Sequence, residues 1–80
     1  MNGPLLIYHM RTHGDTMKSL GQYLGLAYGT VSDKIWGRAT FSLREARAIS
    51  ERYGFTPEEV HQVFFEDVPL TKTNKTENGK

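Results

Sequence analysis

The side chains best suited to binding chemistry fall between residues 16 and 47, where basic residues outnumber acidic ones. Five Lys and Arg residues stand in this stretch against two acids, whereas residues 48–67 carry one Arg against five acids. A basic segment followed by an acidic one is expected where only one face of a protein meets a polyanion. A chance fluctuation of charge on a solvated surface is the alternative, because an excess of three positive charges is modest. The pattern makes nucleic acid a candidate partner.

Few side chains of the chain are suited to metal binding or catalysis. His9 and His13 have the spacing to share a metal on one face of a helix, but a structural zinc site takes four ligands. The chain has no cysteine, which excludes disulfides, thiolate metal sites and cysteine nucleophiles. No phosphate-binding glycine loop and no strained serine turn stands out. We expect no enzyme, no bound metal or cofactor, and no small-molecule substrate.

The elements that position these side chains are predicted to be five helices in one all-α domain over residues 1–67. A chain of 80 residues supports one domain at most. Apolar residues recur at helical spacing, and no alternating strand pattern competes with them. Asp15 or Thr16 caps the second helix, and capping boxes begin the last two at Ser42 and Thr56. Residues 68–80 are polar and are predicted to form a disordered tail.

The same spacing predicts which side chains form the core. The first four helices contribute Leu6, Leu20, Val31, Ile35, Leu43, Ala46, Ile49 and Tyr53. The fifth helix contributes Val60, Val63 and Phe64. Trp36 is expected to be partly buried beside Ile35. No apolar run reaches the roughly 20 residues that span a bilayer, so we expect a cytoplasmic protein with no membrane contact.

Two short helices joined by a tight turn are predicted between Thr16 and Gly37. Helices that cross near a right angle need a small side chain at their closest approach and a glycine where the chain reverses. Gly21 and Gly25 meet these two needs, and Val31 and Ile35 anchor the second helix to the core. The second helix, about residues 28–36, would then project outward and could enter the major groove of DNA.

In these motifs the chain resembles the lambda repressor-like (Cro/CI-type, XRE) helix-turn-helix proteins of phages and prophages. The resemblance covers roughly residues 5–65. It rests on Thr16, Leu20-Gly21, Leu24-Gly25-Leu26, Val31-Ser32, Ile35-Trp36-Gly37-Arg38, Phe41-Ser42-Leu43, Tyr53 to Val60 and Phe64-Phe65. Two departures are that Met17 stands where the family commonly has Gln, and that the recognition helix opens on Ala27-Tyr28-Gly29.

The resemblance implies a sequence-specific transcriptional regulator that binds double-stranded operator DNA. Base contacts would come from Tyr28, Gly29, Thr30 and Asp33. Phosphate contacts would come from Lys18, Ser32, Lys34, Arg38 and Thr40. Lys34 and Arg38 are expected to be exposed, and a homodimer would bind two half-sites about one helical turn apart.

A protein-binding module is the alternative, for example an antirepressor that engages its cognate phage repressor. Met17, Tyr28, Trp36 and Phe65 suit a protein interface better than a polyanion, because aromatic residues and Met are enriched in interface cores. Adjacent Phe64 and Phe65 cannot both face inward on one helix. Phe65 could therefore meet a partner chain, including a second copy.

Overall fold

The computed structural model describes residues 1–68 as five α-helices, with no strand in that range. The helices are α1 (Gly3–Thr12), α2 (Met17–Leu24), α3 (Tyr28–Ile35), α4 (Leu43–Tyr53) and α5 (Pro57–Phe64). This confirms the predicted all-α class and the number of helices in the described part of the chain. The predicted disordered tail lies outside the described residues, apart from Val68.

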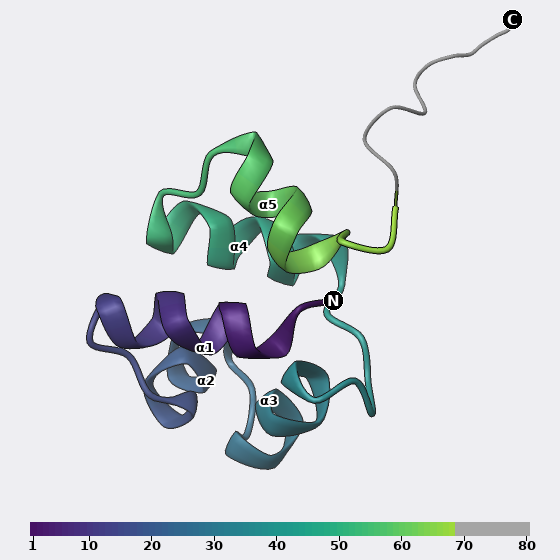
Figure 1. Cartoon of the computed structure of the whole chain (residues 1–80). Coiled ribbons are helices and arrows are strands. Elements are labelled where there is room, and N and C mark those ends of the chain that lie inside the picture. The colour runs from purple at the N-terminus through teal and green to yellow at the C-terminus, as the bar shows by residue number, and fades with distance from the viewer. Residues whose placement is uncertain (69–80) are drawn as a thin grey trace, which may run out of the picture.

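The helices form two groups on either side of α1 (Figure 1). In this view, α4 and α5 lie above α1, whereas α2 and α3 lie below it and pack against each other. The end of α5 contacts the start of α1, where the Asn2 N–H donates to the Val63 carbonyl at 2.7 Å. The arrangement places α3 at an edge of the molecule. Among residues 1–68, no helix is long and apolar enough to cross a membrane.

One hydrophobic core joins all five helices. Its five fully enclosed side chains are Leu6, Leu20, Val31, Ile49 and Val63. Each of these residues comes from a different helix, so no helix can leave without opening the core. Enclosing a Val, Leu or Ile side chain in this way contributes about 1.5–3 kcal/mol.

Local hydrogen bonds fix where the helices begin. Ser42 and Thr56 each form a capping box, with Glu45 and Glu59 respectively, as the sequence predicts. Thr16 caps α2 in the same way, but here Ser19 completes the box. A cap of this kind contributes about 1 kcal/mol. The capping residues thus account for the helix boundaries better than apolar spacing alone.

One predicted core position differs from the structure. Leu43 is 78% exposed, whereas Trp36, expected to be partly buried, is 50% exposed. Leu43 shares a face of α4 with buried Ala46, but it lies in the first turn, at the rim of two shallow grooves and not beneath another helix. Trp36 lies just after α3, where it caps the helix. The prediction that Leu43 belongs to the core is wrong.

Candidate functional site

The contact between α2 and α3 depends on the absence of a side chain at Gly21. A Cβ atom there would lie 2.6 Å from the Leu26 carbonyl oxygen and 3.2 Å from a methyl of Val31. Gly25 then ends α2 in the left-handed conformation, with φ of 75°, which glycine adopts without strain. The Leu26 N–H donates to the Gly21 carbonyl at 2.8 Å. These contacts fix the angle at which α3 leaves α2.

One side of α3 faces the core and the other is uncovered by the described residues. Val31 and Ile35 are buried, which confirms their predicted core positions. Tyr28, Gly29 and Asp33 are exposed on the other side. The tyrosine is 61% exposed, and nothing lies within 4 Å of the position a Cβ would take at Gly29. The first turn and outward face of α3 are therefore open to a partner.

The N-terminus of α3 differs from those of the other four helices. Asn2, Thr16, Ser42 and Thr56 each accept a hydrogen bond from the first turn of their helix. The residue before α3 is Ala27, which has no side chain able to do so. The first N–H groups of a helix carry partial positive charge. This end of α3 therefore has unsatisfied donors that an anionic partner could accept from.

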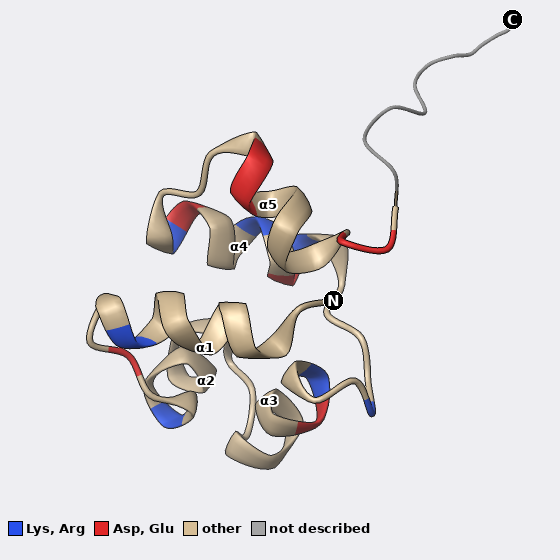
Figure 2. Cartoon of the chain, viewed as in Figure 1, with Lys and Arg blue, Asp and Glu red and all other residues tan. Residues whose placement is uncertain are grey.

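Asp33 and Arg38 form an ion pair on this face, and Figure 2 shows acidic and basic segments close together along α3 and the loop after it. The Nε of Arg38 lies 2.8 Å from Oδ1 of Asp33, and both side chains are more than half exposed. The Arg38 N–H also donates to the Asp33 carbonyl at 2.8 Å. Exposed pairs of this kind contribute at most about 1 kcal/mol. Both groups can therefore exchange partners when another molecule binds.

The remaining predicted contact residues lie around α3. Lys18 on α2 and Thr40 in the loop before α4 are exposed. Thr30 and Ser32 are partly buried within α3 itself. The structure thus places all the predicted base-contacting residues on α3, and places exposed basic residues on neighbouring segments, Lys18 on α2 and Arg38 just after α3.

Lys34 has a different environment from the one predicted. Its Nζ donates to Oε1 of Glu45 at 2.7 Å, and the two side chains are only 14% and 19% exposed. The hydrogen bond from Lys34 is the main reason why the pKa of Glu45 lies below its usual range. Glu45 also accepts from the Ser42 N–H. The expectation that Lys34 is exposed is wrong, because its charge fastens the end of α3 to the start of α4.

A hollow beside α3 brings together three of the four residues predicted for a protein interface. Met17, Tyr28 and Trp36 line a groove of about 400 Å³, together with Ile7 and Met10 of α1. The fourth residue, Phe65, follows α5 and does not line this groove. Arg11, Asp15 and Thr16 also line it, so the hollow beside α3 combines an apolar floor with charged and polar side chains.

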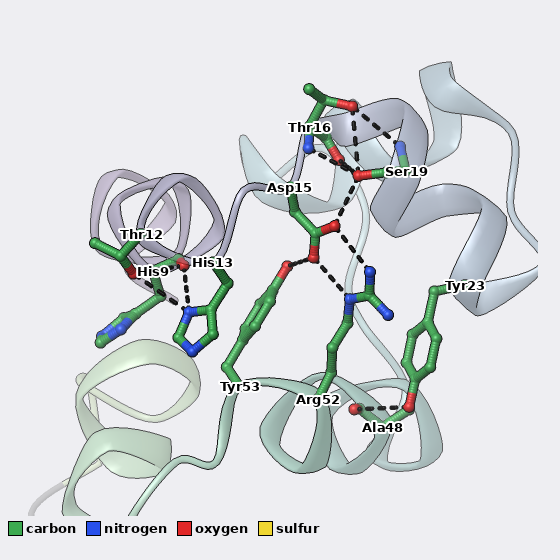
Figure 3. A network of polar contacts seen from close by, with 10 residues as sticks. All are labelled: His9, Thr12, His13, Asp15, Thr16, Ser19, Tyr23, Ala48, Arg52 and Tyr53. Carbon is green, nitrogen blue, oxygen red and sulfur yellow. Dashed lines mark hydrogen bonds and ion pairs between the residues drawn. The ribbon is translucent and has the colours of Figure 1, made fainter.

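Hydrogen bonds of Asp15 connect the start of α2 to α4 (Figure 3). Its carboxylate accepts two hydrogen bonds from Arg52, from Nε at 2.7 Å and from Nη2 at 2.8 Å. It also accepts from the Tyr53 hydroxyl at 2.7 Å and the Ser19 hydroxyl at 2.8 Å. The Arg52 guanidinium lies 4.5 Å from the centre of the Tyr23 ring. This network joins the loop before α2 to the last turn of α4.

The network shifts the protonation of its members. The hydrogen bond from Arg52 holds the pKa of Asp15 well below its usual range, and the Tyr53 and Ser19 hydroxyls act in the same direction. Burial raises the pKa of Tyr53 above its usual range, and the neighbouring carboxylate raises it further. Sequence reasoning missed this role and offered Asp15 as a helix cap. Its charged partner lies 37 residues away, and no local pattern indicates the pair.

The two histidines of α1 and its end make contacts within the fold. Nδ1 of His13 lies 2.9 Å from the His9 carbonyl oxygen. The His13 ring packs on Tyr53 at 4.8 Å and the His9 ring packs on Phe55 at 4.7 Å, between ring centres. Across residues 1–68, no three His, Asp or Glu side chains gather where they could hold a metal ion.

The chain matches no protein-family model, no curated protein and no solved structure.

Proposed function

We propose that this chain is a DNA-binding transcriptional regulator in which α2 and α3 form a helix-turn-helix. The observation that carries the proposal is the outward face of α3, whose exposed first turn has no capping side chain. The close contact at Gly21 fixes this helix against α2. A helix held in this way can enter the major groove with its N-terminal residues at the base edges. The resemblance of the motifs to lambda repressor-like proteins agrees with this assignment.

Different residues of this face would contact the bases and the phosphates of DNA. Tyr28, Thr30 and Asp33 would meet base edges, and a carboxylate can accept from the cytosine amino group. The open space over Gly29 would allow DNA to approach the α3 backbone. Lys18 would set the register through a phosphate on one side. Ser32, Arg38 and Thr40 would bind phosphates on the other side of α3.

The ion pair between Asp33 and Arg38 suggests how the face changes on binding. In the free protein each group satisfies the other at 2.8 Å. Arg38 would turn to a phosphate as Asp33 turns to a base, so both charges remain paired. Lys34 keeps its bond to Glu45 and has no part in this exchange.

Salt titration of binding to a selected duplex tests the proposal. Binding duplexes are first selected from a random library, and affinity is then measured by fluorescence anisotropy between about 50 and 200 mM salt. Replacing both Lys18 and Arg38 by Gln should lower the slope of log affinity against log salt by about one per lost phosphate contact. Lys18→Arg keeps the charge and should keep the slope. Failure to select any duplex at low salt contradicts the proposal.

A protein-docking function is the second candidate, and the groove lined by Met17, Tyr28 and Trp36 favours it. Its volume of about 400 Å³ is enough for a large apolar side chain of a partner, such as a phage repressor that this chain would inhibit. Interfaces commonly place such an anchor at their centre. In this case the outward face of α3 would contact protein and not DNA.

Trp36 provides the measurement that separates the two candidates. It is the only Trp of the chain and is half exposed, so enclosing it in an apolar interface should shift its fluorescence to shorter wavelength. If the protein candidate is right, Met17→Ala should weaken binding to a repressor from the same genome, whereas Arg38→Gln should not. If DNA is the partner, Arg38→Gln should have the larger effect, measured on the selected duplex.

A further inference from the structure

The groove between α1 and the ends of α3 is lined mainly by large apolar side chains. Met10 of α1 is buried in this lining, whereas Tyr28 and Trp36 are 61% and 50% exposed. Tyr28 begins α3 and Trp36 follows its last residue, so the lining includes both ends of this helix. Small-molecule sites are concave, mostly apolar hollows of about 300–1,000 Å³, and the volume of this groove is about 400 Å³. Its size and lining suit a small ligand with one flat apolar ring.

Two charged side chains, Arg11 and Asp15, also line the groove, and they differ in how far they are already paired. The Asp15 side chain is 6% exposed, and its carboxylate accepts four hydrogen bonds, two of them from Arg52. Arg11 is exposed, and no carboxylate of residues 1–68 lies within 4 Å of its guanidinium nitrogens. The Thr16 hydroxyl, which also lines the groove, is engaged in capping α2. The groove therefore offers a ligand one positive charge and no unpaired negative charge.

We propose that this groove binds a small aromatic carboxylate. The ring of the ligand lies among Met17, Tyr28 and Trp36, and its carboxylate pairs with Arg11. Aromatic rings pack favourably against Tyr and Trp in edge-on or offset arrangements, and Met sulfur also makes favourable contacts with aromatic rings. The planar guanidinium of an arginine matches a carboxylate with two parallel hydrogen bonds. The ring and the charge of the ligand thus each meet a complementary group in the lining.

The charges of the lining select among aromatic ligands. A carboxylate carries one negative charge, which Arg11 alone can balance, whereas a phosphate monoester carries about 1.5–2 at neutral pH. An aromatic amino acid adds an ammonium group. The carboxylate that could balance this group, that of Asp15, is already bonded to Arg52. A simple aromatic acid therefore fits the groove better than a nucleotide or an amino acid does.

The aromatic acid differs from the partner side chain considered above as an occupant of the same groove. An apolar side chain of a protein would fill the groove without needing Arg11, whereas the acid depends on both the rings and the arginine. Binding of the acid does not depend on what α3 binds, so its test requires neither DNA nor a partner protein. Failure of this test would leave the proposed DNA binding unaffected.

Titration of the full chain with phenylpropionate at pH 7 and low salt, followed by two-dimensional amide NMR, tests the site. We expect saturable shifts of the Trp36 indole N–H and of the Met17 and Tyr28 amides. Neutral phenylpropanamide and zwitterionic phenylalanine should each bind at least about threefold more weakly, as expected for an ion pair at an exposed arginine. The absence of saturable shifts at these residues overturns the proposal. Equal binding of the acid and either analogue also overturns it, and equal binding of the amide would indicate a purely apolar occupant.

Replacing the arginine separates its charge from the apolar lining. Arg11→Gln should lower the affinity for phenylpropionate to that for the amide, and it should leave binding of the amide unchanged. Arg44→Gln is the matched control, because Arg44 is also exposed, has no carboxylate of residues 1–68 within 4 Å, and lines a different hollow, beside Tyr23. This control should keep the preference for the acid. A preference that persists in Arg11→Gln, or that both variants lose, contradicts the proposed contact.

Discussion

At the scale of single residues, one buried carboxylate joins parts of the chain that lie far apart in sequence. Asp15 accepts hydrogen bonds from Ser19, Arg52 and Tyr53, which link the start of α2 to the end of α4. Only 8% of Asp15 is exposed, so water cannot replace these donors. Removing the charge deprives the arginine and the tyrosine hydroxyl of their charged acceptor.

Asp15→Asn should therefore destabilise the protein by about 1.5–3 kcal/mol, because it weakens the charge-assisted hydrogen bonds from Arg52 and Tyr53, while Arg52, whose side chain is 32% exposed, can still be solvated. The free energy of unfolding in urea at pH 7 measures the effect. Asp33→Asn is the matched control, since Asp33 also pairs with an arginine but is half exposed. The Asp33→Asn substitution should lower the free energy of unfolding by less than about 1 kcal/mol. Equal losses in the two variants would mean that burial adds nothing to the Asp15 network.

The same residue should make stability depend on acid pH. Its pKa in the folded protein is lowered mainly by the hydrogen bond from Arg52, whereas in the unfolded chain it is about 3.9. The contribution of Asp15 to stability is complete at pH values above the pKa that it has in the unfolded chain. Below this pH the unfolded state binds a proton that the folded state does not, so the free energy of unfolding decreases as the pH is lowered. The stability difference between wild type and Asp15→Asn should shrink from pH 4 toward pH 2, measured by urea unfolding. A constant difference would contradict the lowered pKa.

Residue-scale predictions from the sequence succeed where the determining contact is local. Val31 and Ile35 lie on one face of α3, and their spacing alone indicates burial. Lys34 looks like a solvated residue because its partner, Glu45, belongs to the next helix. Leu43 fits the apolar spacing of α4, but burial also requires another element to cover it. Sequence spacing reports the face of a helix and not what lies against it.

At the scale of elements, capping chemistry makes the helix boundaries predictable. Ser42 and Thr56 are followed three residues later by Glu, and both helices begin where this pattern indicates. The boundary is local, so three or four residues determine it. The orientation of α3 relative to α2 depends on Gly21. The sequence indicates this too, because two helices that cross closely need a small residue at the crossing. The way in which α4 and α5 close over α1 has no comparable local signal.

Two helical glycines should respond in opposite ways to alanine. Gly21→Ala places a Cβ 2.6 Å from the Leu26 carbonyl oxygen and should destabilise the protein by about 1–3 kcal/mol, because the two backbones must separate. Gly29→Ala meets nothing within 4 Å and should stabilise it by about 0.5–1 kcal/mol through helix propensity. Thermal and urea unfolding measure both changes.

The same pair of variants also examines what α3 does. Gly21→Ala changes the angle of α3, so partner binding should weaken even under conditions where the variant remains folded. Gly29→Ala keeps that angle, and loss of DNA binding in this more stable variant would show that the partner approaches the backbone at Gly29. Stabilisation by Gly21→Ala would contradict the tight helix contact.

At the scale of the whole molecule, the net charge of +1 conceals an uneven distribution. The α2–α3 face carries Lys18, Arg38 and Asp33, with few other charges nearby (Figure 2). Lys34, which the sequence assigns to this face, is neutralised by Glu45. The field that DNA would meet is therefore weaker than the sequence count suggests. On a face with so few charges, one carboxylate has a large influence.

Asp33→Asn should strengthen non-specific DNA binding by about two- to tenfold at low salt, because it removes a repulsive charge and frees Arg38 for a phosphate. Glu51→Gln is the matched control. It also removes an exposed carboxylate and frees an arginine, Arg47, which Glu51 holds at 3.2 Å on α4. The two variants gain the same net charge and differ only in its position. Anisotropy with a mixed-sequence duplex should separate them if DNA lies on α3. Equal gains would show that net charge alone governs binding, and no gain for Asp33→Asn would favour the protein groove over DNA.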